Sequence, residues 1–382
     1  MNRVMRSALS VLLGIALLGA VLSVSDEPDE ADTVATTGKT TTTLPKGYEA
    51  RQRPTQPTSR PRTTAKRTPA VAAPLDRKQR QVRSTSTDEA VRGYAEYVAL
   101  GDSWSADVVI ADANGLPDDT HAPIDCAQSR TNYPKLVAQA LGITNFRDAT
   151  CGSATTEHFA NPQAGLPLGG TNPPQFDRLT RTTDLVTVGI GGNDAGIAGA
   201  AVSCLSLTPM SVPLGLPLPD LGIPFVSLTE LPTGGCKERF TAGGVDVLAQ
   251  AIARSRPKLV AAFKRIHELS PKARILAVNY LAGLPEQGCW PLVPFTDSDI
   301  QYLHATFLKL NAMVARAAAK ARVELVDAFT PSLGHDVCAG PTERYVEAIG
   351  VLSLNGLAIA VPAHPNSAGA AAQARAVLAT LR

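Results

Sequence analysis

The residues of this chain that could do chemistry lie in four short polar motifs. The motifs are Gly101-Asp102-Ser103, Cys151-Gly152-Ser153, Gly191-Gly192-Asn193-Asp194 and His364-Pro365-Asn366. A serine hydroxyl beside a neutral imidazole can attack a carbonyl carbon, because the histidine accepts the hydroxyl proton. The tetrahedral intermediate that results needs fixed hydrogen-bond donors, which backbone N–H groups and an asparagine amide supply without titrating. Together these residue types predict nucleophilic acyl transfer.

Each motif also has a purely structural interpretation. Gly-Asp-Ser is common in turns, Asn193-Asp194 is suited to cap a helix, and His364 before a proline fits plain loop sequence. Ser103 favours catalysis because it ends the apolar run Val98-Ala99-Leu100, where a helix can begin. A serine delivered there has its backbone N–H at the positive end of the helix dipole. The functional interpretation therefore depends on the motifs occurring together, in positions that a fold can unite.

The elements that must position these motifs alternate along the second part of the chain. Short apolar runs predict strands at 95–100, 144–149, 184–190, 274–280 and 322–327. Amphipathic spacing predicts helices at 131–141, 243–269, 299–321 and 366–381. Strands that alternate with helices indicate an α/β fold with a parallel sheet covered on both faces. Ligands of such sheets bind at the carboxyl ends of the strands, and Ser103, Gly152 and Asn193 each follow a predicted strand.

Two segments interrupt this alternation. Residues 202–236 are rich in Leu and Pro, and residues 283–298 are apolar and contain Trp290. Both segments follow predicted strand ends on the same side as the polar motifs. They are therefore expected either to wall an apolar pocket or simply to cover the core and pack on each other.

The first 90 residues differ in composition from the rest. Residues 1–25 combine two arginines with an uninterrupted apolar run, which predicts a signal peptide or an N-terminal membrane anchor. Residues 26–90 are rich in Thr, Pro and Arg and poor in large apolar side chains, so we expect a disordered tether. Its basic charge could contact an anionic cell wall or membrane surface, and simple solvation is the alternative. The export signal argues against a nucleic-acid partner. Residues 91–382 are the expected catalytic domain, which we expect to be a monomer.

Six cysteines follow the tether, at positions 126, 151, 204, 236, 289 and 338. An even number behind an export signal favours disulfides over metal ligands, and the absence of Cys-x-x-Cys argues against a zinc or thioredoxin-type site. Among the possible pairings, the sequential one (Cys126–Cys151, Cys204–Cys236 and Cys289–Cys338) is the simplest. The other histidines show no metal-ligand spacing, so neither a metal nor another cofactor is expected.

With these motifs in this order, the chain resembles the SGNH or GDSL hydrolases, in particular the secreted three-disulfide lipases and esterases of actinobacteria. The resemblance covers about residues 94–382. It implies a three-layer α/β/α, flavodoxin-like fold with a five-stranded parallel sheet, and ester hydrolysis without a metal. Ser103 would then be the nucleophile and His364 the general base. The N–H groups of Ser103 and Gly152, with the Asn193 amide, would form the oxyanion hole.

One position departs from the family pattern. Family members often carry an aspartate three residues before the histidine, whereas this chain has Val361 there. Valine has no side-chain acceptor, so the resemblance implies a Ser–His dyad in which the backbone carbonyl of Val361 orients His364. A distant acid, Asp327 or Asp336, is the alternative orienting group.

The sequence thus predicts a secreted or surface-anchored serine ester hydrolase that forms an acyl-enzyme on Ser103. The apolar insertions favour a lipid ester as substrate. A carbohydrate acetylesterase is the alternative among enzymes, although aromatic residues that stack on sugars make up only 5% of the chain. A non-catalytic module that binds the cell envelope is the alternative outside enzymes, because the orienting acid is missing. The absence of a Gly-x-Ser-x-Gly motif argues against the α/β-hydrolase fold.

Overall fold

The computed structural model describes residues 93–206, 208–211, 233–348 and 352–382. The predicted signal or anchor at 1–25, the tether at 26–90 and most of the first insertion lie outside these residues. Within the described part, no helix is both long enough and apolar enough to span a bilayer.

The centre of the fold is a parallel sheet of five strands in the order β3-β1-β4-β5-β6. The strands span Glu96–Gly101 (β1), Asn145–Asp148 (β3), Leu185–Gly189 (β4), Arg274–Val278 (β5) and Glu324–Val326 (β6). All neighbouring strands run parallel, which confirms the predicted α/β fold. Because β1 and β4 are adjacent, with Gly101 opposite Gly189, the motifs that follow these two strands emerge side by side.

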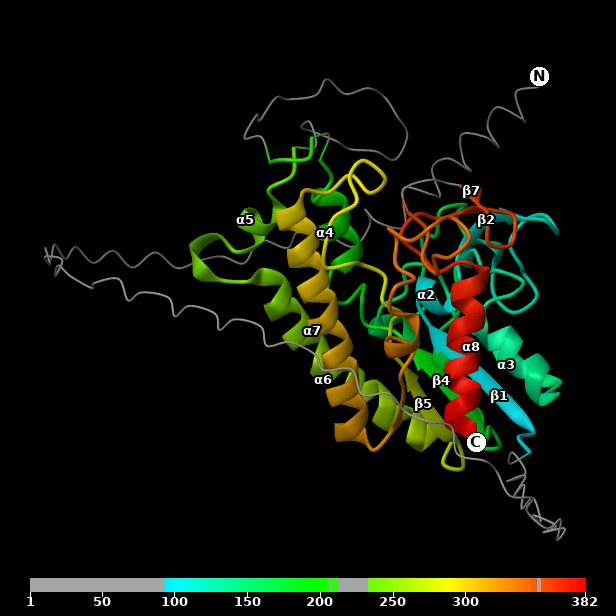
Figure 1. Ribbon diagram of the computed structural model, residues 1–382. Helices are drawn as coiled ribbons and strands as arrows, with labels where there is room; N and C mark the ends of the chain where they lie inside the picture. The colour runs from blue at the N-terminus through cyan, green and yellow to red at the C-terminus, as the bar shows by residue number, and fades with distance from the viewer. Residues whose placement is uncertain (1–92, 207, 212–232, 349–351) are drawn as a thin grey trace, which may run out of the picture. The chain divides into compact units, whose positions relative to one another are not determined.

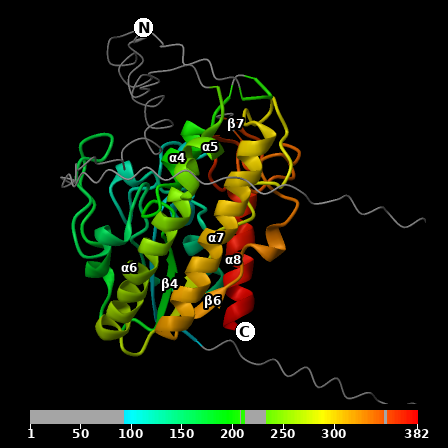
Figure 2. The ribbon, with the colours of Figure 1, turned by 90° about the vertical axis from the view of Figure 1, so that its left-hand side faces the viewer.

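Helices cover both faces of this sheet, as Figure 1 shows. One face carries α3 (Tyr133–Leu141) and α8 (Ser367–Leu381). The other face carries α6 (Val247–Leu269) and α7 (Asp297–Ala321), which stand in front of β4 in Figure 2. These four helices correspond to the four that the amphipathic spacing predicts.

Strand β1 shows how the sheet serves two cores. Tyr97 and Ala99 pack into the core beneath α3 and α8, whereas Val98 and Leu100 pack into the core beneath α6 and α7. All four side chains are fully buried. Burial on both faces explains why this strand is apolar without alternation.

The remaining elements are short, and of these the sequence indicated only the helix start at Ser103. A second, antiparallel sheet has the order β2-β8-β7 and consists of β2 (Val109–Asp112), β8 (Ala358–Ala360) and β7 (Leu352–Ser353). The short helices are α2 (Ser103–Ala106), α4 (Ile197–Ser203) and α5 (Cys236–Phe240). Single 3₁₀ turns are η1 (Ile124–Cys126), η2 (Thr156–Phe159), η3 (Gln175–Arg178), η4 (Ala242–Gly244) and η5 (Thr330–Ser332).

Three disulfides cross-link the loops at the carboxyl edge of the sheet. They join Cys126 to Cys151, Cys204 to Cys236 and Cys289 to Cys338, which is the sequential pairing. The first links the loop before α3 to the segment after β3, and the second closes the first insertion. The third ties the second insertion to the chain beyond β6.

The described ends of the two insertions contact each other. The Ser206 N–H donates to the Pro294 carbonyl at 2.7 Å, and Leu205 and Phe295 form an isolated antiparallel bridge. Phe295 is buried and belongs to the same apolar cluster as Cys204, Cys236 and Ile300. Of the two expectations for these segments, packing on each other and on the core is therefore the one seen at these ends.

Candidate active site

The nucleophile motif forms a tight turn between β1 and α2. Asp102 caps the helix, because its Oδ1 accepts the Trp104 N–H at 3.0 Å, and its own N–H donates to the Gly189 carbonyl. A Cβ on Gly101 would lie 2.6 Å from that same carbonyl oxygen, so only glycine lets the two strand ends approach this closely. The turn thus presents Ser103 at the carboxyl edge of the sheet.

His364 meets Ser103 at this edge, although it comes from the far end of the chain. Its Nε2 lies 2.8 Å from the Ser103 Oγ. Its Nδ1 lies 2.8 Å from the Pro362 carbonyl oxygen, to which the ring can only donate. This bond fixes the tautomer and leaves Nε2 as the acceptor for the serine proton. The two side chains are therefore arranged as a Ser–His dyad.

The carbonyl that orients His364 belongs to Pro362, so the prediction of Val361 was wrong by one residue. Ala363 adopts a left-handed conformation with φ of 58°. This turn in the backbone brings the His364 imidazole close to the carbonyl of Pro362. Val361 is instead buried in a small apolar cluster beside α2. The alternative acids do not orient the ring either, because Asp327 and Asp336 accept N–H groups within their own loops.

Burial lowers the pKa of His364 to about 4, although its hydrogen bond to Pro362 acts in the opposite direction. Among the residues that the structure describes, no carboxylate bonds to the ring to stabilise its charged form. An imidazole with so low a pKa is neutral at neutral pH, which is the form that can accept a proton.

Glu347 supports the histidine loop and was not among the residues predicted from the sequence. Its N–H donates to the His364 carbonyl at 2.8 Å, and its carbonyl accepts the Ala363 N–H at 2.9 Å. Its fully buried carboxylate pairs with Arg344 and accepts a hydrogen bond from the Asn366 amide at 2.8 Å. Glu347 is the one charged residue between Arg344 and His364. A lone charge in an apolar run was the signal that could have identified it.

The expected oxyanion donors lie at the same edge, but two of them already make hydrogen bonds. The Asn193 Nδ2 donates to the Ala154 carbonyl at 3.0 Å, and an amide carries a second hydrogen. The Gly152 N–H donates to the Cys126 carbonyl at 3.1 Å, so this single hydrogen is engaged. The Ser103 N–H belongs to the first residue of α2.

Comparisons with known proteins identify the family of this chain. The GDSL-like Lipase/Acylhydrolase family matches residues 99–372, from inside β1 to inside α8. The chain belongs to this family. Lipase 2 of Streptomyces coelicolor is 33% identical over 279 residues, which cover 72% of this chain and 81% of that lipase. An esterase of Streptomyces scabiei is 29% identical over 302 residues, which cover 73% of this chain and 84% of the esterase.

Solved structures show the same fold. A phospholipase A1 from Streptomyces albidoflavus has a TM-score of 0.54 at 22% identity and aligns over 76% of this chain and 100% of its own. An extracellular lipase from Streptomyces rimosus has a TM-score of 0.52 at 22% identity, over 75% of this chain and 100% of its own. The protein is thus a GDSL-family ester hydrolase of the lipase/esterase type with the expected α/β architecture.

In this GDSL hydrolase, Asp194 does not cap the helix that follows it. That helix, α4, begins at Ile197, and its N-cap is Gly196. The Asp194 carboxylate instead accepts the N–H and the hydroxyl of Thr156, at 2.9 and 2.5 Å. Asp194 therefore ties the loop after β4 to η2, which follows the Gly152 segment.

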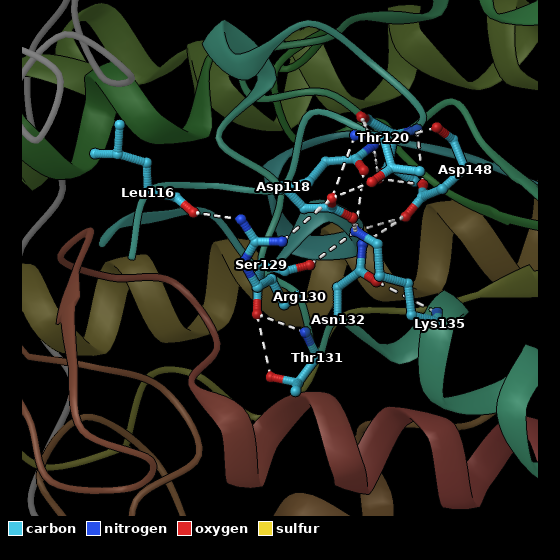
Figure 3. Close-up of polar contacts among 11 residues, drawn as sticks. Leu116, Asp118, Thr120, Ser129, Arg130, Thr131, Asn132, Lys135 and Asp148 are labelled. Carbon is cyan, nitrogen blue, oxygen red and sulfur yellow. Dashed lines mark hydrogen bonds and ion pairs between the residues drawn. The ribbon is translucent and has the colours of Figure 1, made fainter. Parts of the chain in front are cut away.

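A buried polar cluster holds the β3 side of the hydrolase site, and Figure 3 shows its members. Lys135 on α3 donates to the Gln128 Oε1 at 3.0 Å and lies 3.1 Å from the Asp118 carboxylate. Asp148 at the end of β3 is fully buried and accepts the Asn132 amide at 2.7 Å. Burial would raise the pKa of Asp118, but hydrogen bonds from Thr120 and Lys135 outweigh it and lower the pKa to about 2. The cluster fixes α3 against the strand that leads to Cys151 and Gly152.

Proposed function

We propose that this GDSL hydrolase cleaves carboxylic esters through an acyl-enzyme on Ser103. His364 Nε2 takes the hydroxyl proton as the Ser103 Oγ attacks the ester carbonyl carbon. The tetrahedral intermediate then expels the alcohol, to which His364 returns the proton. Water, deprotonated by His364 in the same way, releases the acid and restores the serine. The 2.8 Å contact between Oγ and Nε2 is the observation that carries this proposal.

In this mechanism the negative oxygen of the intermediate is held by the Ser103 N–H and by the second amide hydrogen of Asn193. The Gly152 N–H joins them by exchanging its bond to the Cys126 carbonyl for one to the substrate. The Pro362 carbonyl accepts the Nδ1–H throughout and stabilises the imidazolium that forms in each half-reaction. A backbone carbonyl carries a partial charge only, so this stabilisation is weaker than that from a carboxylate.

The favoured substrate class is the lipid ester. Four large aliphatic side chains are exposed on the β7–β8 hairpin, which leads directly to His364: Leu352, Leu354, Leu357 and Ile359. Aliphatic surface on the hairpin that leads to the proposed base suits acyl chains better than sugar rings, which favours a lipase or esterase over a carbohydrate acetylesterase. The direct contact between Ser103 and His364 argues against a non-catalytic module.

We infer that the enzyme acts outside the cell. The apolar segment at 8–24 after a basic start, the three disulfides and the extracellular lipase among the structural neighbours all support export. Anchoring at the surface, through residues 1–25 or through the basic tether, is the alternative to release.

A fluorophosphonate probe tests the mechanism, because it modifies only an activated serine. We expect a single adduct on Ser103 by peptide mapping, and none after H364A. Hydrolysis of p-nitrophenyl esters of increasing chain length tests the substrate class. A strong preference for acetyl over octanoyl esters would overturn the lipid assignment, and an adduct on another serine would overturn the mechanism.

A further inference from the structure

Tyr280 is a buried tyrosine just beyond β5, and its hydroxyl contacts both sides of the proposed site. It donates to the Asp102 Oδ2 at 2.6 Å and accepts the Gly192 N–H at 2.8 Å. Asp102 begins the nucleophile turn, and Gly192 directly precedes Asn193. We propose that Tyr280 is a positioning residue that fixes the Asn193 amide relative to Ser103. This inference rests on the proposed function, in which both groups act on one ester carbonyl.

The direction of each hydrogen bond in this bridge follows from chemistry. A backbone N–H can only donate, so the Tyr280 oxygen is the acceptor for Gly192. The single hydroxyl hydrogen is then left for the Asp102 carboxylate, whose other oxygen accepts the Trp104 N–H. The hydroxyl thus donates its one hydrogen and accepts one other, and these two directed bonds fix its position.

Tyr280 is itself held rigidly, as a positioning residue must be. The Asn311 side-chain amide on α7 binds both backbone groups of Tyr280, accepting its N–H at 2.9 Å and donating to its carbonyl at 3.0 Å. The phenol ring packs edge-on against Trp104 and Phe307, at centroid distances of 5.4 and 5.7 Å. Its hydroxyl position is thus set by α7 and by the core, independently of the loop it holds.

The backbone carbonyls of the segment that Tyr280 contacts accept N–H groups from the residues that follow it, and the Tyr280 hydroxyl adds a link through the Gly192 N–H. Between β4 and Asn193 lie two consecutive glycines, and Gly191 has a φ of 124°, a conformation open mainly to glycine. Such a segment has many accessible conformations, and a displacement of about 1 Å at a catalytic group can cost about a hundredfold in rate. The Tyr280 hydroxyl binds the N–H immediately before Asn193, where it can restrict that freedom most.

Tyr97 provides a matched control. Its hydroxyl oxygen also makes a buried hydrogen bond and lies 2.7 Å from the Thr187 Oγ1. Its ring is also buried against a face of the sheet. It lies within β1 on the opposite face from the Tyr280 ring and touches none of the proposed site residues. Y97F and Y280F therefore each remove a phenolic oxygen from a buried position. They differ in whether that oxygen contacts the proposed site.

The experiment measures kcat, KM and melting temperature for Y280F, Y97F, N193A and the Y280F/N193A double variant of the full chain. We expect Y280F to lower kcat by about tenfold to a hundredfold with KM unchanged, since a misplaced donor is lost only in the transition state. Y97F should lower the melting temperature similarly but leave kcat unchanged. The double variant should be no slower than N193A, because Tyr280 acts through that amide.

Other outcomes overturn the inference. It fails if Y280F retains full kcat while N193A is slow, or if the two losses multiply in the double variant. A full rate in N193A would overturn the oxyanion assignment itself, and the bridge with it. Loss of the fluorophosphonate adduct on Ser103 would instead mark failure of the proposed mechanism. Should Y280F not fold, N311A serves in its place, because it releases the Tyr280 backbone without touching Asp102 or Gly192; an unchanged kcat there would also overturn the inference.

Discussion

The two halves of the proposed catalytic pair are positioned by different means. Ser103 lies directly after a central strand, and its turn is held by backbone contacts between neighbouring strands, such as the Asp102 N–H on the Gly189 carbonyl. His364 lies in a loop outside the parallel sheet. Its backbone is held by hydrogen bonds to the Glu347 backbone, and the Glu347 side chain is in turn paired with the buried Arg344. The nucleophile thus derives its place from the sheet, and the base from tertiary polar contacts.

This difference shows where the enzyme is vulnerable. Backbone hydrogen bonds between strands do not depend on side-chain identity, so at the nucleophile turn the sensitive positions are the glycines, the Asp102 side chain and Tyr280, which contacts it. The histidine loop depends on charged groups that are costly to bury unless all of them are paired. The group that orients the ring is also local, a carbonyl two residues away. A displacement of this loop therefore also displaces the imidazole.

The largest expected effect comes from breaking the contact between the two halves. S103A and H364A should each lower kcat by about 10⁴-fold or more, and the double variant should be no slower than either, because the pair acts as a unit. Steady-state kinetics on a soluble ester measures this. An H364A enzyme that retained most of its rate would mean that another group acts as the base.

The next effect concerns the support of the base. E347Q leaves the buried Arg344 cation without its partner, so we expect the free energy of unfolding to fall by about 3–5 kcal/mol. We also expect a lower kcat, because both Ala363 and His364 hydrogen-bond to the Glu347 backbone. E324Q is the matched control: it breaks the partly exposed pair with Arg274 and should cost less than about 1 kcal/mol, with kcat unchanged. Equal losses in the two variants would contradict the role given to the histidine loop.

Removal of the disulfide next to β3 should have a slightly smaller effect on stability. Removing the bond between Cys126 and Cys151, through paired serine substitutions, frees a loop of 25 residues and should cost about 3–4 kcal/mol through the unfolded chain. The segment that carries Gly152 is then no longer tied through Cys151 to the loop before α3, so kcat should fall together with the melting temperature. An unchanged melting temperature in this variant would show that the bond does not stabilise the folded state.

The same contrast explains what the sequence could predict. Strand ends of a parallel sheet meet at one edge by topology alone, so the positions of Ser103 and Asn193 followed from the order of the elements. The strands of the second sheet, two to four residues long, are too short for any periodicity to reveal. The choice of Pro362 over Val361 depends on one left-handed residue in a loop. Tyr280 and Glu347 act through contacts that only the folded chain creates.

The smallest expected effect is on the pH dependence of activity, which reports how burial shifts the pKa of the base. The pKa of His364 is lowered to about 4, mainly by burial, and the proposed mechanism uses the neutral form. The acid limb of the kcat/KM profile should therefore lie well below the 6.5 of an ordinary imidazole. At about pH 5.5 the enzyme should retain nearly full activity, where a base with an unshifted pKa would have lost about tenfold.

The lowered pKa of His364 should also make the stability of the fold depend on pH. Because the pKa of His364 is lower in the folded than in the unfolded state, protons bind preferentially to the unfolded chain. This residue therefore contributes a loss of stability as the pH falls from about 6.5 toward 4, and no change above that window. Denaturant unfolding of the wild type and of H364Q across this range isolates the contribution, because glutamine does not titrate. Parallel pH profiles for the two proteins, together with an acid limb near 6.5, would place His364 in water rather than in the desolvated contact with Ser103.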